Sequence, residues 1–123
     1  MINTGVMIAV VEDDDGLRTA LEQLLRSAGF RAATFASAEE FLANPSRVDA
    51  QCLVADINLP GITGAELVHK VRSNGRPLPS VLITGRRDIP TAELARQAEE
   101  VPLLYKPFSD AALFEVIDRV MRR

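Results

Sequence analysis

Short apolar runs that each end at a polar residue constrain the fold of this 123-residue chain most strongly. The runs cover residues 6–11, 52–55, 81–83 and 103–105. Segments whose apolar residues recur at helical spacing separate them, and this alternation predicts βαβ units with a parallel sheet and helices on both faces. A further short strand is expected at residues 31–35. We therefore expect one α/β domain over residues 1–123, with five strands and five helices.

A polar side chain suited to phosphoryl chemistry follows each of these runs. The residues concerned are Glu12, Asp13, Asp56, Thr84 and Lys106. The carboxyl ends of parallel strands form the crevice in which open α/β sheets place their ligands, so these side chains should converge. Carboxylates that lie close together repel unless a cation lies between them, and an oxygen-only ligand set suits Mg²⁺. The pattern predicts a magnesium site with one carboxylate left free to accept a phosphoryl group.

Four sequence blocks are similar, in order and spacing, to the signature blocks of receiver domains of bacterial two-component response regulators. The blocks are VVEDD, VADINLPGITG, LITG and YKPF. Each block alone is weak, because acidic pairs and Lys-Pro dipeptides are common, but all four lie at expected strand ends. The resemblance covers the chain from about Val6 to the C-terminus. It implies a flavodoxin-like doubly wound five-stranded parallel sheet of order 2-1-3-4-5, and a signalling domain rather than an enzyme.

The resemblance implies a role for each residue of the expected crevice. Asp56 would be the phosphoacceptor, at the end of an apolar run that should form the centre of the sheet. The implied Mg²⁺ ligands are Glu12, Asp13, Asp56 and the backbone carbonyl of Asn58. Thr84 would hydrogen-bond one phosphoryl oxygen, and Lys106 would neutralise another. The family also implies a cis peptide bond between Lys106 and Pro107.

The acidic run after the first strand offers more than one pair of metal ligands. In the family an arginine-like position follows the second acid by five residues, and Arg18 follows Asp13 at that spacing. This alignment selects Glu12 and Asp13 for the metal. Asp14 or Asp15 then remains to cap the first helix, because acids favour a helix N-terminus.

Two further sets of residues are implied to control the phosphorylated state. Receivers commonly carry Phe or Tyr three residues before the lysine, where this chain has Leu103. Tyr105 shares a strand face with Leu103 and could partly take over the switching role. Asn58 and Arg86, each two residues beyond a site residue, are implied to flank the path of an attacking water and to set the acyl-phosphate lifetime. The implied output surface is the fourth helix, the fifth strand and the fifth helix.

Other functions fit parts of the sequence. A phosphohydrolase of the haloacid-dehalogenase type would use Asp13 as nucleophile and Asp15 as acid/base, but Leu17 stands where that family has Thr or Val. A flavin carrier would need Ser, Thr and Gly in the first loop, where acids would repel a phosphate. A receiver-like module that binds partners without phosphorylation, or acts as a phosphate sink, stays open because of Leu103.

Composition limits the partners and the compartment. The net charge of −3 argues against direct nucleic-acid binding, and no apolar stretch approaches the ~18 residues of a membrane span. Cys52 is the single cysteine and cannot form an internal disulfide, so we expect a cytoplasmic, buried thiol. The lone histidine, His69, should face solvent on a helix. The expected partners are a sensor histidine kinase or phosphotransfer protein, and a downstream protein or fused output domain; a homodimer stays open.

Overall fold

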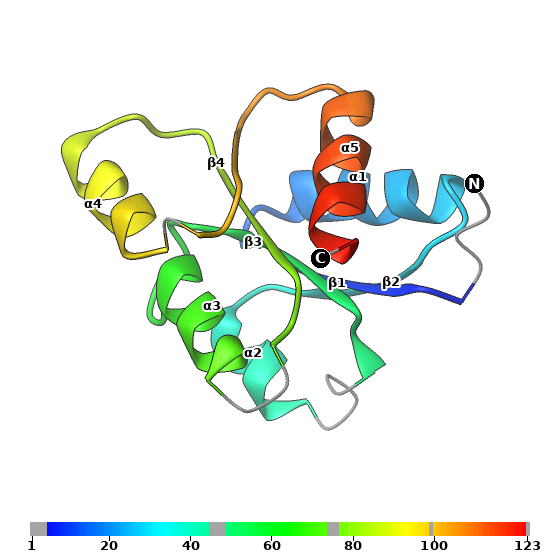
Figure 1. Cartoon of the computed structure of the whole chain (residues 1–123), viewed down its shortest axis with the longest axis horizontal. Helices are drawn as coiled ribbons and strands as arrows, with labels where there is room; N and C mark the ends of the chain where they lie inside the picture. The colour runs from blue at the N-terminus through cyan, green and yellow to red at the C-terminus, as the bar shows by residue number, and fades with distance from the viewer. Residues whose placement is uncertain (1–4, 45–48, 74–76, 99, 123) are drawn as a thin grey trace.

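The computed structural model describes residues 5–44, 49–73, 77–98 and 100–122, which form a parallel sheet flanked by helices (Figure 1). The strands are β1 (Met7–Val11), β2 (Arg31–Phe35), β3 (Cys52–Asp56), β4 (Ser80–Thr84) and β5 (Leu103–Tyr105). The helices are α1 (Asp15–Ser27), α2 (Ala38–Ala43), α3 (Gly64–Arg72), α4 (Ile89–Gln97) and α5 (Asp110–Met121). Strands and helices alternate along the described chain, as the sequence pattern predicts.

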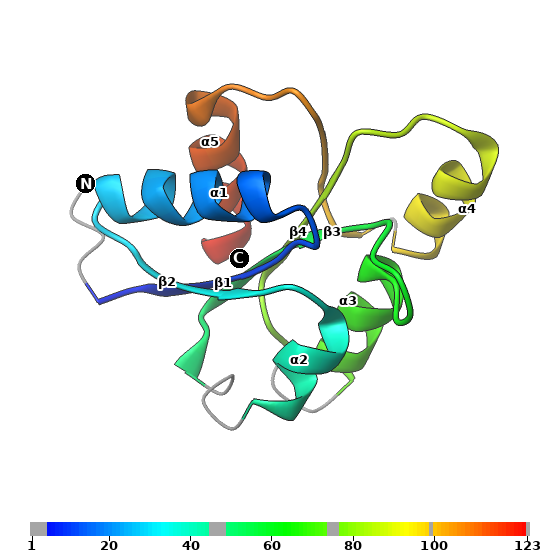
Figure 2. The same cartoon turned by 180° about the vertical axis from the view of Figure 1, so that it is seen from behind.

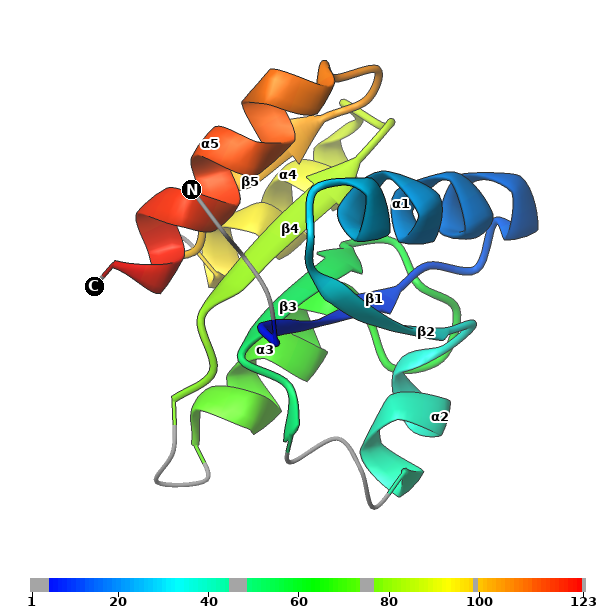
Figure 3. The same ribbon diagram turned by 90° about the vertical axis from the view of Figure 1, so that its right-hand side faces the viewer.

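The strand order is β2-β1-β3-β4-β5, and every neighbouring pair in the described sheet is parallel. This confirms the predicted doubly wound sheet of order 2-1-3-4-5. All residues of β3 and β4 are buried because helices cover both faces of these strands, which explains why residues 52–55 and 81–83 are all apolar. Figure 3 shows the sheet with β3 in its middle. Asp56 therefore ends the central strand, at the edge where this fold binds ligands.

Alternate residues of the central strands face two separate cores. In β3, Leu53 and Ala55 belong to the core that α2 and α3 cover, whereas Cys52 and Val54 belong to the core that α1 and α5 cover. Figure 2 shows the same division from behind, with α1 and α5 on one side of the sheet and α2 and α3 on the other. Helices of the described chain thereby cover both faces of the sheet.

Two predictions about single residues are confirmed. Cys52 is fully buried, and burial raises the pKa of its thiol to about 12, so this thiol is an unreactive part of the core. His69 is exposed on α3. Among the helices of the described ranges, none combines the length and the apolar character needed to cross a membrane.

A polar side chain caps the N-terminus of each helix in the described chain by accepting a backbone N–H from the first turn. The capping residues are Asp14, Ser37, Thr63, Asp88 and Ser109. Asp14 takes the capping role that the sequence left to Asp14 or Asp15. The caps after β1, β3 and β4 lie in the loops at the carboxyl edge of the sheet, so they also fix the course of the loops that carry polar side chains there.

Candidate functional site

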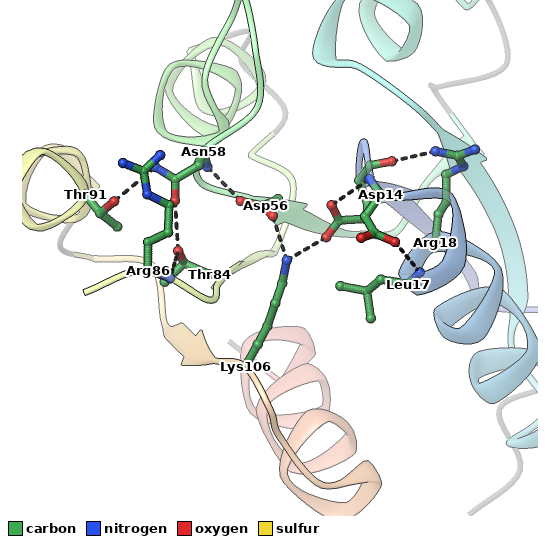
Figure 4. Close-up of polar contacts among 10 residues, drawn as sticks. Asp14, Leu17, Arg18, Asp56, Asn58, Thr84, Arg86, Thr91 and Lys106 are labelled. Carbon is green, nitrogen blue, oxygen red and sulfur yellow. Dashed lines mark hydrogen bonds and ion pairs between the residues drawn. The ribbon is translucent and has the colours of Figure 1, made fainter. Parts of the chain in front are cut away.

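Polar side chains from four strands meet at the carboxyl edge of the sheet. They are Glu12 and Asp13 after β1, Asp56 at the end of β3, Thr84 at the end of β4 and Lys106 after β5. Figure 4 shows Lys106 extending from the end of β5 toward Asp56. Residues that are up to 94 positions apart in the chain are thus direct neighbours in the structure.

Three of these side chains form a compact acidic cluster. Carboxylate oxygens of Glu12, Asp13 and Asp56 all lie within 4.8 Å of one another. Glu12 is fully buried, Asp56 is 7% exposed, and Asp13 is exposed. The cluster therefore has two acids packed inside the protein and one that opens toward solvent.

The electrostatics of the cluster favour a bound cation. Burial raises the pKa of Glu12 above its ordinary value of 4.5, and the charge of Asp56 adds to this effect; hydrogen bonds from the Asp14 backbone and from Lys106 offset part of it. The negative charge is therefore only partly compensated by the protein. The donor atoms are all carboxylate oxygens, which fit Mg²⁺, a hard cation that binds to oxygen and keeps several waters.

Lys106 bridges the two buried acids. Its Nζ donates to Glu12 Oε1 at 3.0 Å and to Asp56 Oδ2 at 2.7 Å. Burial alone would lower the pKa of this ammonium, but the hydrogen bonds and charges of Asp56 and Glu12 outweigh burial and raise the pKa above 10.5. The peptide bond between Lys106 and Pro107 is cis, as the resemblance implies. Lys106 is therefore a cation in direct contact with Asp56.

The loop after β3 holds Asp56 from the other side. The backbone N–H of Asn58 donates to Asp56 Oδ1 at 2.7 Å, so each oxygen of this carboxylate has its own donor. Gly64 begins α3 directly against the same backbone: a Cβ there would overlap the Asp56 carbonyl oxygen and lie 2.8 Å from the Ile57 Cα. A glycine is required because the chain returns within contact of the strand end.

Thr84 is fully buried, and its hydroxyl is directed at Asn58. Thr84 Oγ1 donates to Asn58 Oδ1 at 2.8 Å and accepts the backbone N–H of Arg86 at 3.1 Å. The other end of the Asn58 amide, Nδ2, donates to Thr91 Oγ1 in α4 at 3.0 Å. Asn58 thus links the end of β4 to the first turn of α4 (Figure 4).

Arg86 pairs with Asp88, the capping residue of α4. Arg86 Nε and a terminal guanidinium nitrogen lie 2.7 and 2.6 Å from Asp88 Oδ2. Side-chain and backbone hydrogen bonds from Thr91, followed by the pairing with Arg86, lower the pKa of Asp88 to about 2. The structure therefore does not bring the Arg86 guanidinium into the acidic cluster but holds it at the start of α4.

The comparison with protein families decides the class of protein. A family model for the response regulator receiver domain matches residues 8–118. The chain is a response-regulator receiver domain. The match spans all four blocks that the sequence analysis singled out, and it assigns the chain to two-component signalling rather than to the haloacid dehalogenases or the flavin carriers.

Similar proteins support the same assignment. The receiver is 35% identical over 116 residues to the transcriptional regulatory protein FixJ of Bradyrhizobium diazoefficiens, which covers 94% of the receiver and 57% of FixJ. It is 39% identical over 102 residues to the C4-dicarboxylate transport transcriptional regulatory protein DctD of Rhizobium meliloti, covering 83% of the receiver and 22% of DctD. The receiver spans about half the length of the FixJ proteins that it matches, 57% and 52% in two of them.

Solved structures agree with the fold. The crystal structure of FixJ-N superposes with a TM-score of 0.82 at 32% identity, covering 96% of the receiver and 94% of FixJ-N. The chemotaxis protein CheY4 of Vibrio cholerae gives 0.80 at 25% identity, covering 94% and 98% of the two chains. The BeF3-activated DrrB receiver domain gives 0.79 at 25% identity and covers both chains completely.

Leu103 and Tyr105, which the sequence suggests as switch residues, lie in different surroundings. Leu103 is partly buried and packs against the core under α2 and α3. Tyr105 is 38% exposed, and the Arg87 guanidinium carbon lies 3.9 Å from the centre of its ring. In the receiver's present conformation Tyr105 is therefore a surface ring under a cation, whereas Leu103 is part of the packing against the core.

Thr91 and Asp88 are neighbours of the site that sequence reasoning missed. Thr91 is only 2% exposed although it lies in the first turn of a helix. The sequence Asp-Ile-Pro at residues 88–90 carries the signal for an N-cap, because proline favours the first turn and aspartate the position before it. No sequence signal connects Thr91 to Asn58, which precedes it by 33 residues.

Proposed function

We propose that this receiver accepts a phosphoryl group on Asp56 from a sensor histidine kinase or a phosphotransfer protein. The observation that carries the proposal is the paired carboxylate of Asp56 inside an acidic cluster: Lys106 holds one oxygen, the Asn58 N–H holds the other, and two more carboxylates lie within 4.8 Å. Such a cluster lowers the stability of the folded protein, because it places like charges together in a poorly solvated pocket. A structural role therefore does not account for it.

In the transfer step an Asp56 carboxylate oxygen attacks the phosphorus of a phosphohistidine. A P–O bond forms, the P–N bond breaks, and the imidazole leaves and takes up a proton. Lys106 neutralises phosphoryl charge from its position 2.7 Å from Asp56 Oδ2. Glu12, Asp13, Asp56 and the Asn58 carbonyl would hold Mg²⁺, which supplies positive charge to the phosphoryl oxygens when bound. Thr84 would donate its hydroxyl hydrogen to a phosphoryl oxygen.

Phosphorylation would then alter the surface of α4, β5 and α5. Thr84 is the site residue that leads directly into this region, through the loop that carries Arg86 and Arg87. Repacking of Leu103, together with Tyr105 on the same strand, would transmit this movement to the surface. The output would be a separate downstream protein, a fused output domain or a homodimer formed through this surface. We infer a cytoplasmic signalling protein without a direct nucleic-acid or membrane role for this domain.

The lifetime of the acyl phosphate would depend on Asn58 and Arg86. Asn58 lies in hydrogen-bond contact with Asp56 and can orient an attacking water. Arg86 would have to leave Asp88 before it could pair with the phosphoryl group. We also propose that the receiver catalyses its own dephosphorylation.

Acetyl phosphate with Mg²⁺ tests the acceptor directly. Borohydride trapping followed by mass spectrometry should locate the label on Asp56, and Asp56→Asn should abolish it. Label on Asp13, or undiminished labelling in Asp56→Asn, would overturn the proposal.

The output requires a separate readout. Beryllofluoride with Mg²⁺ should shift backbone amide resonances from α4 through α5 as well as those around Asp56. Shifts confined to the surroundings of Asp56 would instead identify a phosphate sink or a module that binds partners without phosphorylation, which is the alternative that Leu103 leaves open.

A further inference from the structure

A continuous chain of hydrogen bonds connects the end of β4 to the first turn of α4. The Arg86 N–H donates to Thr84, the Thr84 hydroxyl donates to Asn58, and Asn58 donates to Thr91. The same turn of α4 is capped by Asp88, whose Oδ1 accepts the backbone N–H of Thr91 at 2.8 Å. Among the described residues, no buried side-chain nitrogen or oxygen lacks a partner, so this chain is fully satisfied.

The Thr84 hydroxyl can donate only once, because it carries a single hydrogen. In this structure that hydrogen goes to Asn58 Oδ1 at 2.8 Å. The same hydrogen is the one that a phosphoryl oxygen on Asp56 would accept. A phosphoryl group and Asn58 therefore compete for one donor, and Thr84 must give up Asn58 before it can turn toward the phosphorylated side chain.

In this structure the Asn58 amide presents its nitrogen to Thr91 and its oxygen to Thr84. An amide presents a donor at one end and an acceptor at the other, and the Thr91 oxygen accepts from Nδ2 at 3.0 Å. With Nδ2 held by α4, Oδ1 is directed at Thr84. Thr91 is 2% exposed, so water cannot easily replace its oxygen as the acceptor.

We propose that Thr91 is a positioning residue that holds Thr84 in its unphosphorylated orientation by fixing the Asn58 amide. The first turn of α4 and the phosphoryl group then compete for Thr84, which couples the position of α4 to the state of Asp56. This inference rests on the proposed phosphorylation of Asp56. The inference adds a residue of α4 that stabilises the unphosphorylated state, in addition to the residues that respond to phosphorylation.

The hydrogen-bond chain can be tested without any phosphodonor. Thr91→Val removes the hydroxyl while keeping the branched shape, Thr91→Ala removes it without bulk, and Thr91→Ser retains it. Amide NMR of the first two variants should show shifts of the Asn58 side-chain amide and of the Arg86 backbone amide, while Thr91→Ser stays close to the wild type. Thr34→Val in β2 is the matched control and should leave both resonances unchanged. Unmoved Asn58 and Arg86 resonances in Thr91→Val and Thr91→Ala would overturn the proposal.

Beryllofluoride binding in the presence of Mg²⁺ tests the competition. Loss of one buried hydrogen bond that exists only in the unphosphorylated state should tighten binding about fivefold in Thr91→Val and Thr91→Ala. Thr91→Ser and Thr34→Val should bind like the wild type. Equal or weaker binding by both hydroxyl-deficient variants would overturn the role of Thr91 while leaving Asp56 as acceptor. A wild-type receiver that neither binds beryllofluoride nor labels on Asp56 would overturn the proposed function and the competition with it.

Discussion

The close approach of α3 to the end of β3 makes Gly64→Ala a sharp test of how the site is built. The added Cβ would overlap the Asp56 carbonyl oxygen and lie 2.8 Å from Ile57 Cα and 2.9 Å from Asp56 C. All three are backbone atoms, and the Gly64 N–H is itself bonded to the Ile57 carbonyl at 3.1 Å, so neither segment can move alone. Overpacking costs ~1–3 kcal/mol, and rigid backbone favours the upper end of that range or slightly more. The gain in helix propensity recovers less than ~1 kcal/mol, which leaves a net loss of ~2–3 kcal/mol.

Urea unfolding of Gly64→Ala should show this loss as a lower midpoint with an unchanged slope, and thermal unfolding should show a midpoint lower by ~10 °C. Labelling of Asp56 by acetyl phosphate should slow as well, because the displaced atoms belong to Asp56 itself. Gly85→Ala is the matched control: its Cβ would lie 3.6 Å from Lys106 Cδ, an ordinary contact, and stability should stay within ~0.5 kcal/mol of the wild type. A Gly64→Ala variant as stable as Gly85→Ala would refute the argument from close approach.

Three further predictions concern the charges of the site. Asp13→Ala should weaken Mg²⁺ binding, whereas Lys106→Ala should keep or tighten it because a nearby cation is lost; equal losses in Mg²⁺ titrations would contradict these roles. Burial raises the pKa of Glu12, and a carboxylate with a raised pKa stabilises the fold below its unfolded pKa of 4.5 and loses that contribution as the pH rises. In metal-free urea titrations the free energy of unfolding of the wild type should therefore fall as the pH rises above 4.5, Glu12→Gln should lack this fall, and Mg²⁺ should offset it in the wild type. Arg86→Ala should change the acyl-phosphate lifetime several-fold, equivalent to ~1 kcal/mol of barrier, and an unchanged decay rate of the label on Asp56 would contradict its role.

Local sequence signals determined most of the fold. The apolar runs became strands because buried parallel strands need apolar residues on both faces, and helices began where residues such as Asp14 could cap them. The meeting of Glu12, Asp56 and Lys106 follows from topology alone, since parallel strands present their carboxyl ends at one edge. These features depend on residue type and order, which the sequence contains.

The detailed partners within the site could not be predicted in the same way. Thr84 donates to Asn58, and Arg86 pairs with Asp88, because of side-chain rotamers and of the position that packing gives to α4. Strand alternation predicts that Tyr105 shares a face with Leu103, and both residues lie in β5. It does not show that the shortness of β5 leaves the tyrosine at the exposed strand end. Contacts of this kind depend on tertiary packing that spacing along the chain does not encode.

The stacking of Arg87 on Tyr105 gives the receiver an intrinsic optical probe of the proposed output surface. The chain contains one tyrosine and no tryptophan, so its ultraviolet emission comes from a ring on β5, 3.9 Å from the guanidinium carbon of Arg87. Arg87 belongs to the loop that follows Thr84, and displacement of this loop would change the surroundings of the ring. If the proposed switch moves this loop, tyrosine fluorescence of the unlabelled protein should change when beryllofluoride and Mg²⁺ are added.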